Sequence, residues 1–412
     1  MGLAYSVFII AVWFISTTYV VFLLLTLFQK RNELYTDHLE LTDTPLVSVI
    51  VPAYNEEKDI GKGIESLKEL EYPNYEVIVL NDGSTDNTAS EARAAINGDN
   101  RFTLIDNEDN KGKAGVLNQG IEHSNGTIVA TMDADSMVQP KALNKAVPYF
   151  YDEKVGSVTV TVEVANREAT WLTRLFSVEF MIGLSLLLKI CSFHNAIYVT
   201  PGPFSMYRKS VMEDIGGFDE ENLTEDLEIA YRIHKAGYKI ENCLEAKVRT
   251  NLPETWTGTY RQRRRWYVGG IQTLTQHRDM MFNRKHGVFS FLVPWNFTLV
   301  FLGLGLFAST LYLAAKSWAS TISGLRYTGL SALFNNWAFE FDVFRYAFTD
   351  IIGASALLLS FIILATGLYY ARKPVKNELG GILLYPMMYV LYQVFWFFAI
   401  CNVLFKKEVA WR

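Results

Sequence analysis

The sequence predicts an α/β domain with a doubly wound, mostly parallel sheet, joined to an α-helical transmembrane bundle. From Val47 onward, short runs of Val, Ile and Leu alternate with helical segments. A run of 24 residues without a charge, Tyr5–Phe28, precedes this alternation, and three more apolar runs follow position 287. A charged domain between membrane spans accounts for these features.

The composition excludes some classes of protein. Half of the 412 residues are hydrophobic and 20% are charged, against roughly 25% in a soluble domain. The net charge of −5 disfavours a nucleic-acid-binding protein, which usually presents a basic face. Cys191, Cys243 and Cys401 show no CxxC spacing, so we expect neither a disulfide framework nor a zinc site, as suits a reducing compartment.

The first apolar run is expected to be a retained membrane anchor at residues 1–30. It is too long for a signal peptide, and no basic residue precedes it. Lys30 and Arg31 follow the run directly. The positive-inside rule therefore places the next domain in the cytoplasm. With the apolar runs after position 287, the chain is expected to be a multi-pass protein of the cell membrane.

The alternation of strands and helices predicts the sheet. Strands are expected at Val47–Pro52, Tyr75–Asn81, Phe102–Asp106, Thr127–Asp133 and Ser157–Val164. Helices are expected at Glu56–Leu70, Thr85–Ile96 and Lys113–His123, and a later helix begins at Thr224-Glu225-Asp226 and continues to Ala236. In such sheets ligands bind beyond the carboxyl ends of the strands. Polar residues stand there in three places: Tyr54-Asn55-Glu56, Asp82-Gly83-Ser84 and Asp133-Ala134-Asp135.

Two segments mix apolar and charged residues. Trp171–Phe193 contains Arg174, Glu179 and Lys189, so we expect a helix on the membrane surface rather than a span that buries these charges. Thr259–Asn283 carries five arginines among aromatic residues, which suits an anionic membrane face or a phosphorylated ligand.

The end of the chain is expected to cross the membrane. Its spans are expected near Ser290–Ala315, Ile351–Tyr370 and Gly381–Phe405. A simple count of four spans leaves Lys406, Lys407 and Arg412 outside. A break at Pro386 would instead make the last segment re-entrant or interfacial and return the tail to the cytoplasm. Both arrangements stay open.

Asp133 and Asp135 are the first candidate site residues. They follow an apolar strand and have no basic neighbour in the sequence. A hard divalent cation with its own phosphate ligands would relieve this negative charge and could neutralise a departing diphosphate. The alternative is a solvated turn, which is the commoner explanation of an isolated pair of this kind.

Other motifs add candidate contacts. Asp82 could bind a base or ribose, or only begin a turn. Glu56 could accept ribose hydroxyls, and Lys113 could contact a base or a diphosphate. In Thr224-Glu225-Asp226, a carboxylate could act as a general base on an acceptor hydroxyl, or the acids could only complement the helix dipole. In Gln262-Arg263-Arg264-Arg265-Trp266, an arginine could hold a diphosphate and the tryptophan could stack on a sugar. Most of these arginines, however, are expected to face lipid.

Taken together and in this order, the motifs resemble family 2 glycosyltransferases, specifically the processive membrane synthases of cellulose, chitin, hyaluronan and poly-N-acetylglucosamine. The resemblance covers Val47 to Trp266. It implies a GT-A fold and an inverting enzyme that polymerises a β-linked polysaccharide from a UDP-sugar, such as UDP-GlcNAc, and passes it across the membrane.

The resemblance also implies roles for the site residues. The nucleotide would contact Tyr54, Glu56, Asp82, Lys113 and Asp133. Asp135, together with Asp133, would bind Mg²⁺ or Mn²⁺, and Asp226 would be the catalytic base. The diphosphate and the acceptor would contact Glu225, Gln262, Arg265 and Trp266. The segment Thr200–Phe204 would form the acceptor floor, where Pro203 stands in place of an expected small residue.

Four domains are expected: an anchor (1–30), a cytoplasmic GT-A domain (45–250), interfacial helices (251–286) and a transmembrane bundle (287–412). The expected partners are a nucleotide-sugar donor, a polysaccharide or glycan acceptor, the lipid bilayer and a small membrane accessory subunit, but no nucleic acid.

Two other functions are considered. A non-processive enzyme would add a single sugar to a lipid-linked acceptor, and the length of the product would distinguish it. A transporter or channel that only senses a nucleotide sugar would be expected to lack a catalytic carboxylate and to carry charges in its spans. Asp133, Asp135 and Asp226 are all present, and the spans carry almost no charge.

Overall fold

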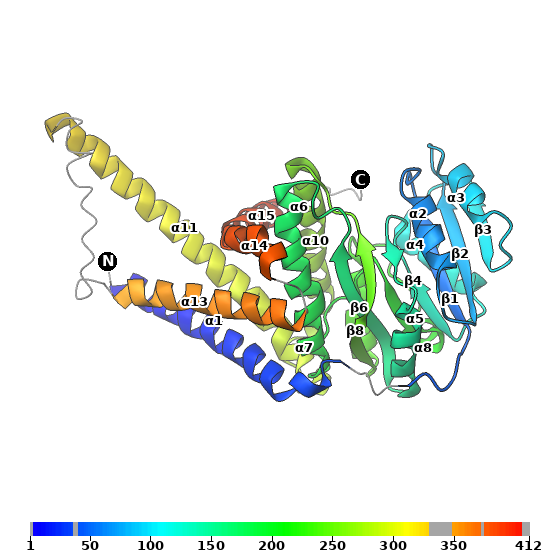
Figure 1. Cartoon of the computed structure of the whole chain (residues 1–412). Helices are drawn as coiled ribbons and strands as arrows, with labels where there is room; N and C mark the ends of the chain where they lie inside the picture. Colours follow the sequence, from blue (N-terminus) through cyan, green and yellow to red (C-terminus); the bar gives the residue numbers. More distant parts are fainter. Residues whose placement is uncertain (1–2, 36–39, 329–347, 372–374, 406–412) are drawn as a thin grey trace.

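The computed structural model describes residues 3–35, 40–328, 348–371 and 375–405. An eight-stranded sheet flanked by helices forms one end of the molecule, and the long helices α1, α11 and α13 extend from the other end (Figure 1). A layer of helices that contains α6 and α10 lies between these two parts.

Four parallel strands form one half of the sheet, in the order β3-β2-β1-β4. They are β1 (Val47–Ala53), β2 (Tyr75–Asp82), β3 (Phe102–Asn107) and β4 (Ile128–Thr131). The Val and Ile side chains of β1, β2 and β4 are almost entirely buried in the core, as expected for strands covered on both faces. The first four strands expected from the sequence are therefore confirmed.

The other half of the sheet is mixed. Its strands are β5 (Met137–Val138), β6 (Val155–Val164), β7 (Ser205–Arg208) and β8 (Lys239–Thr250). β7 is antiparallel to both β4 and β6, whereas β6 and β8 are parallel, and β5 lies antiparallel at the edge. The fold class is confirmed, with two antiparallel strands that the sequence did not indicate.

Helices cover both faces of this sheet and connect its strands. They are α2 (Ile60–Lys68), α3 (Thr88–Ile96), α4 (Gly112–His123), α5 (Ala142–Ala146), η2 (Val147–Tyr151), α8 (Lys209–Ile215) and α9 (Glu225–Lys235). α2 begins four residues later than expected, because the backbone turns at Asn55, which has a φ of 55°. The turn leaves Tyr54 and Glu56 on a loop at the end of β1.

A second layer of helices separates the sheet from the long apolar helices. It consists of α6 (Trp171–Phe180), the π-helical η3 (Met181–Leu187), α7 (Leu188–Ser192) and α10 (Trp256–Gln276). Trp171–Ser192 is long and apolar enough to cross a membrane, yet 72% of it is buried in the protein. Its charges have partners there: Arg174 pairs with Glu168, Glu179 pairs with Arg263, and Lys189 donates to a backbone oxygen.

Three further helices have the length and composition of membrane spans: α1 (Leu3–Gln29), α11 (Phe289–Thr328) and α13 (Phe348–Tyr370). α1 and α13 lie side by side (Figure 1), and the indole of Trp13 donates to Ser355 Oγ at 2.8 Å. Short 3₁₀ turns flank the domain at η1 (Arg31–Glu33), η4 (Arg278–Met280) and η5 (Arg284–His286). The length and composition of these helices indicate a membrane protein.

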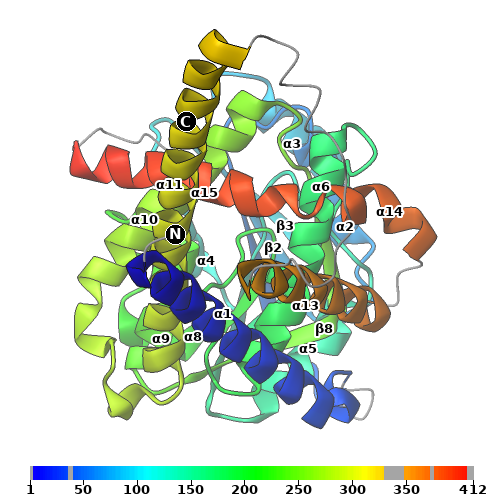
Figure 2. The same ribbon diagram turned by 90° about the vertical axis from the view of Figure 1, so that its left-hand side faces the viewer.

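The last apolar segment is divided at Pro386, which is the break that one of the two arrangements left open above requires. α14 (Val375–Leu384) ends before this proline, and α15 (Met387–Leu404) begins after it. Figure 2 shows α15 running across α11. Trp396 of α15 stacks on Tyr267 of α10, with ring centroids 4.3 Å apart. The expected tail residues Lys406, Lys407 and Arg412 lie outside the described residues.

Candidate active site

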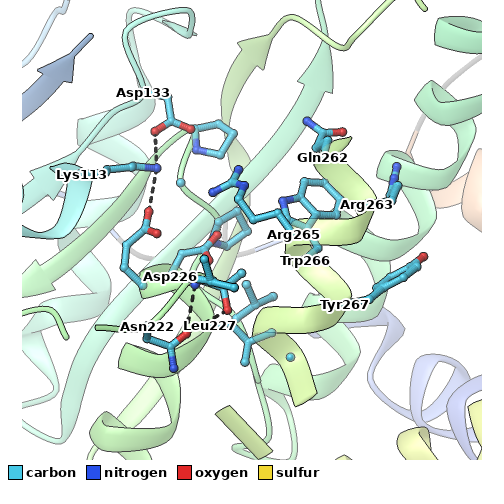
Figure 3. Close-up of a pocket in the computed structure, with 18 of the residues that line it drawn as sticks. Lys113, Asp133, Asn222, Asp226, Leu227, Gln262, Arg263, Arg265, Trp266 and Tyr267 are labelled. Carbon is cyan, nitrogen blue, oxygen red and sulfur yellow. Dashed lines mark hydrogen bonds and ion pairs between the residues drawn. The ribbon is translucent and has the colours of Figure 1, made fainter. Parts of the chain in front are cut away.

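A cavity of about 1500 Å³ lies at the carboxyl ends of the parallel strands, between the sheet and the helices α9 and α10 (Figure 3). All of the site residues expected from the sequence line it: Tyr54, Glu56, Asp82, Lys113, Asp133, Asp135, Glu225, Asp226, Gln262, Arg265 and Trp266. They come from segments far apart in the chain. The cavity exceeds the roughly 300–1,000 Å³ of an ordinary small-molecule site, so it has room for more than one substrate.

Asp82, at the end of β2, orders the loop that precedes α4. Its carboxylate accepts hydrogen bonds from the backbone N–H of Lys111 (2.7 Å) and of Gly112 (3.1 Å). Burial raises the pKa of Asp82, although these two hydrogen bonds and Lys111 oppose that rise. The side chain therefore positions the start of α4, which carries Lys113, and its contact with a base or ribose remains a prediction.

Lys113 is the buried cation of the site. Its Nζ lies 2.6 Å from Asp133 Oδ1 and 2.8 Å from Glu225 Oε1. Burial disfavours the charged form, but Asp133, Glu225 and Asp226 together raise the pKa of Lys113 above its ordinary value. A Cβ at Gly202 would lie 2.8 Å from this Nζ and 2.9 Å from Asp133 Oδ2, so a larger residue there would displace the ion pair. Lys113 thus connects the strand end at Asp133 to the first turn of α9.

Asp135 lies in an excess of negative charge. Burial, Asp133 and Glu56 raise the pKa of Asp135 to about 7, against a hydrogen bond of 3.3 Å from Thr250 Oγ1. Carboxylate oxygens in such a field are the ligands that Mg²⁺ and Mn²⁺ prefer. Within the described residues, no three His, Cys, Asp or Glu side chains gather into a metal site. Asp135 therefore fits a cation that also takes ligands from phosphate and water.

Asp226, the second residue of α9, is a half-buried carboxylate with a raised pKa. Burial and Glu225 raise the pKa of Asp226 to about 6, although Lys113 and Arg265 oppose this. Its backbone oxygen accepts hydrogen bonds from Thr200 N (2.9 Å) and Thr200 Oγ1 (2.8 Å). This joins α9 to the segment whose Pro203 lines the cavity. Such a carboxylate is ionised at neutral pH and basic enough to accept a proton.

Helix α10 brings its motif close to α9. Figure 3 shows Arg265 pointing from α10 toward Asp226, with Gln262 and Trp266 on the cavity side of the helix. A Cβ at Gly269 would lie 2.4 Å from Thr224 Oγ1, so the two helices approach more closely than any other residue permits. The approach places the arginine of one helix beside the carboxylates of the other.

Sequence reasoning missed Asn222, which fixes this approach. Its Oδ1 accepts a hydrogen bond from Thr224 N (3.0 Å), and its Nδ2 donates to Thr273 Oγ1 of α10 (3.1 Å). One side chain therefore holds the start of α9 against α10. Asn222 lies three residues before the first residue of α9, and the sequence holds no signal of its partner on α10.

Arg263 also differs from the expectation, since it does not face lipid. Its guanidinium is buried and makes two hydrogen bonds to the Glu179 carboxylate, at 2.7 and 2.5 Å. A buried arginine is normally paired in this way. Glu179 lies 84 residues earlier in the chain, so the sequence could not distinguish this arginine from its neighbours.

Beyond Trp266 the cavity continues toward the apolar helices. Its lining there is mostly aromatic and aliphatic, and includes Tyr19 of α1, Leu184 of η3, Phe297 of α11, and Tyr392 and Trp396 of α15. One end of the cavity is thus charged and the other end is apolar. The motif residues of α10 lie between the two ends.

Comparisons with known proteins agree with this geometry. Residues 48–216 match the family described as Glycosyl transferase family 2. The chain is 30% identical over 275 residues to the poly-beta-1,6-N-acetyl-D-glucosamine synthase of Staphylococcus aureus (strain COL), which covers 66% of this chain and 65% of the relative. It is 29% identical over 278 residues to the protein of the same name from Staphylococcus epidermidis. The matched region thus spans about two thirds of the length of these relatives.

A solved structure shares the fold over nearly the whole chain. It is the mannosyltransferase PcManGT from Pyrobaculum calidifontis, in complex with GDP-Man and Mn²⁺. The TM-score is 0.65 at 22% identity, and the similarity covers 97% of this chain and 100% of the other. The arrangement of a sheet domain with apolar helices is therefore found in another protein.

Proposed function

Residues 48–216 form a glycosyl transferase family 2 domain with a GT-A fold, and from this premise we propose that the chain is an inverting glycosyltransferase. It transfers a sugar from a nucleoside diphosphate donor to a glycan acceptor, and the product is a polysaccharide. One observation carries the proposal. Asp226, a carboxylate with a raised pKa, lies in the same cavity as Lys113, Asp133 and Asp135, and Trp266 also lines that cavity.

The proposed reaction is a single displacement at the anomeric carbon. Asp226 takes the proton of the acceptor hydroxyl while the acceptor oxygen forms a bond to that carbon. The bond between the carbon and the diphosphate oxygen breaks, and its electron pair leaves with the nucleoside diphosphate. Because one base acts and no covalent enzyme intermediate forms, the configuration inverts. The positive charge on the sugar ring develops as in glycoside hydrolysis.

The other residues act on the leaving group and the acceptor. Lys113 and Arg265 present positive charge to the departing diphosphate. A divalent cation held by Asp135 with Asp133 would neutralise further charge on the diphosphate as a Lewis acid. Tyr54, Glu56 and Asp82 contact the nucleotide, and Gln262 and Trp266 hold the acceptor. Glu225 keeps Lys113 in place through their ion pair.

The proposed donor is UDP-GlcNAc or a related UDP-sugar. The staphylococcal relatives, by their name, synthesise a polymer of N-acetylglucosamine, and they are similar to this chain over 275 and 278 residues. The mannosyltransferase of similar fold was solved with GDP-Man and Mn²⁺, so this donor and this metal belong in any test.

We propose that the enzyme is processive and that its polymer crosses the membrane with the help of other chains. In the apolar windows of α1 and α11, only 6% and 0% of the residues are buried. The outer sides of these described spans are therefore free to contact lipid, a second copy or a small membrane accessory subunit, which we propose takes part in forming the channel.

One observation favours a second candidate, the transfer of a single sugar to a lipid-linked acceptor. The apolar end of the cavity reaches Tyr19 of α1 and Leu299 of α11, two helices whose outer surfaces are open to lipid. A lipid tail could leave the cavity between them while the sugar stays near Asp226. The third candidate, a sensor without catalysis, does not explain why Asp226 lies beside the donor residues.

The proposed topology has three spans, α1, α11 and α13, with the domain at 45–250 in the cytoplasm. α1 ends before Lys30, and Arg284 and Lys285 precede α11, so both spans have basic residues on the domain side. With α15 running across the other helices, the tail returns to the cytoplasm. The proposed topology keeps the other three expected domains: the anchor (1–30), the interfacial helices (251–286) and the transmembrane bundle (287–412).

Product analysis tests the proposal. The full-length protein in membranes is incubated with radiolabelled UDP-GlcNAc or GDP-Man and Mn²⁺, and the product is separated by organic extraction and gel filtration. The expected product is a large, water-soluble polymer with β-linkages. A singly glycosylated product in the organic phase would favour the second candidate. The absence of transfer from every nucleotide sugar would contradict both.

A further inference from the structure

A cluster of hydrogen-bonded polar side chains lies behind the acceptor side of the cavity, at the contact of α6, α10 and α15. Glu179 of α6 makes two hydrogen bonds to Arg263 of α10, at 2.7 and 2.5 Å. The hydroxyl of Tyr392 of α15 donates to the same carboxylate. The mechanism proposed above uses none of these three residues, although all of them line the cavity.

The cluster touches the motif through Trp266. The Cζ of Arg263 lies 4.5 Å from the centroid of the Trp266 ring and 4.6 Å from that of Phe176. Residues three apart are neighbours on a helix surface, so Arg263 is placed to lie against this indole. Phe180 packs near the same ring, with centroids 6.2 Å apart. Figure 3 shows Arg263 and Tyr267 on the side of α10 away from Asp226.

The Arg263 guanidinium restricts the orientation of the Trp266 ring more than apolar packing alone would. A guanidinium with two hydrogen bonds to a carboxylate has a fixed plane and a fixed position. A cation above an aromatic ring is attracted to the face of that ring, by about 2 kcal/mol when both are desolvated. The Glu179 carboxylate is itself fixed by Tyr392, so the indole rests on a rigid support.

We propose that Glu179 and Arg263 form a positioning pair that holds Trp266 in the orientation that receives the acceptor sugar. The inference rests on the proposed function, because it takes Trp266 as the surface on which the acceptor stacks. Arg263 does not touch the reacting atoms. Its effect reaches the reaction through the orientation of one side chain, so its loss weakens acceptor binding and leaves donor binding unchanged.

Arg263→Lys tests this directly, because lysine keeps the charge opposite Glu179 but loses the planar two-point contact. Kinetics are measured on the full chain in membranes, with UDP-GlcNAc as donor and a β-1,6-linked N-acetylglucosamine trisaccharide as acceptor. We expect the acceptor KM to rise about tenfold, with the donor KM unchanged. Glu179→Gln should act in the same direction. The matched control is Arg174→Lys, because Arg174 of α6 pairs with Glu168 and neither residue lines the cavity; this variant should change neither KM.

A double variant separates positioning from general stability. If the pair acts through Trp266, Arg263→Lys should add nothing to the acceptor KM of Trp266→Ala, since the supported ring is already absent. Additive losses, or an unchanged acceptor KM in a folded Arg263→Lys variant, would overturn the inference. Failure of the proposed function gives a different result: the wild-type protein transfers no sugar, or Trp266→Ala leaves the acceptor KM unchanged.

Discussion

The Nζ of Lys113 lies 2.8 Å from Oε1 of Glu225, which joins the helix at the donor side of the cavity to the helix that carries Asp226. The same Nζ lies 2.6 Å from Asp133. One ammonium group therefore sets the position of α4, the end of β4 and the start of α9 relative to each other. The catalytic base that we propose, Asp226, is the next residue after this contact.

Replacing this cation should destabilise the domain. Lys113→Met leaves Glu225 buried without the cation it contacts, with Arg265 as a remaining positive neighbour, and breaking a buried pair typically costs about 3–5 kcal/mol. The melting temperature of the purified protein in detergent should fall. The double variant Lys113→Met/Glu225→Gln, which removes the orphaned charge, should melt at a higher temperature than the single variant. A single variant as stable as the wild type would contradict the role of the pair.

Asp135→Ala should weaken the binding of a nucleotide sugar that depends on a divalent cation. The variant removes the carboxylate whose surroundings are most negative, so the cation loses its main protein ligand. Titration of UDP with increasing Mn²⁺ should show a large loss of affinity that high Mn²⁺ restores in part. Asp214→Ala, at an exposed position on α8, is the control. An unchanged Mn²⁺ dependence would count against the metal role.

The rate of transfer should fall in mild acid. Burial and Glu225 raise the pKa of Asp226 to about 6, and a base accepts a proton only when it is ionised. Below this pKa the protonated fraction grows, so kcat/KM should decrease about tenfold for each pH unit and level off above pH 7. Pre-steady-state or single-turnover rates between pH 5 and 8, each at saturating Mn²⁺, measure this. A flat profile through pH 6 would contradict the assignment.

Adjacent glycines of α10 offer a test of the close approach between α9 and α10. A Cβ at Gly269 would lie 2.4 Å from Thr224 Oγ1, whereas at Gly270 its nearest neighbour would be an atom of Phe297 at 3.8 Å. Gly269→Ala should therefore separate the helices and reduce both stability and transfer. Gly270→Ala should stabilise the helix by up to about 1 kcal/mol and preserve transfer. If both variants had the same stability and the same rate of transfer, the close approach of α9 and α10 at Gly269 would be contradicted.

The parallel half of the sheet could be predicted from the sequence because each of its strands is a continuous apolar run. β1 and β2 start at the predicted residues, since strands buried on both faces leave a plain hydrophobic signal. β7 and β8 left no such signal. β7 has four residues, and β8 contains charged side chains at the positions that face outward. Their places depend on contacts with β6 that are distant in sequence.

The residues that line the site were predictable, but their supports were not. Asp133, Asp135 and Asp226 follow local patterns that a sequence shows directly. Arg263 has the same local pattern as the arginines beside it, and only its pairing with Glu179 on another helix distinguishes it. Asn222 is the same kind of case, since its partner Thr273 lies on α10. Long-range pairing of polar side chains is decided by the packed structure.

The most direct test of the account is Asp226→Asn, measured for nucleotide binding and for sugar transfer in the same preparation. The amide has the size of the carboxylate but cannot accept the proton of an acceptor hydroxyl. The account predicts that transfer falls by about 10³-fold while Mn²⁺-dependent UDP binding stays within about twofold of the wild type. Transfer at a rate close to that of the wild type would contradict the assignment of Asp226 as the base.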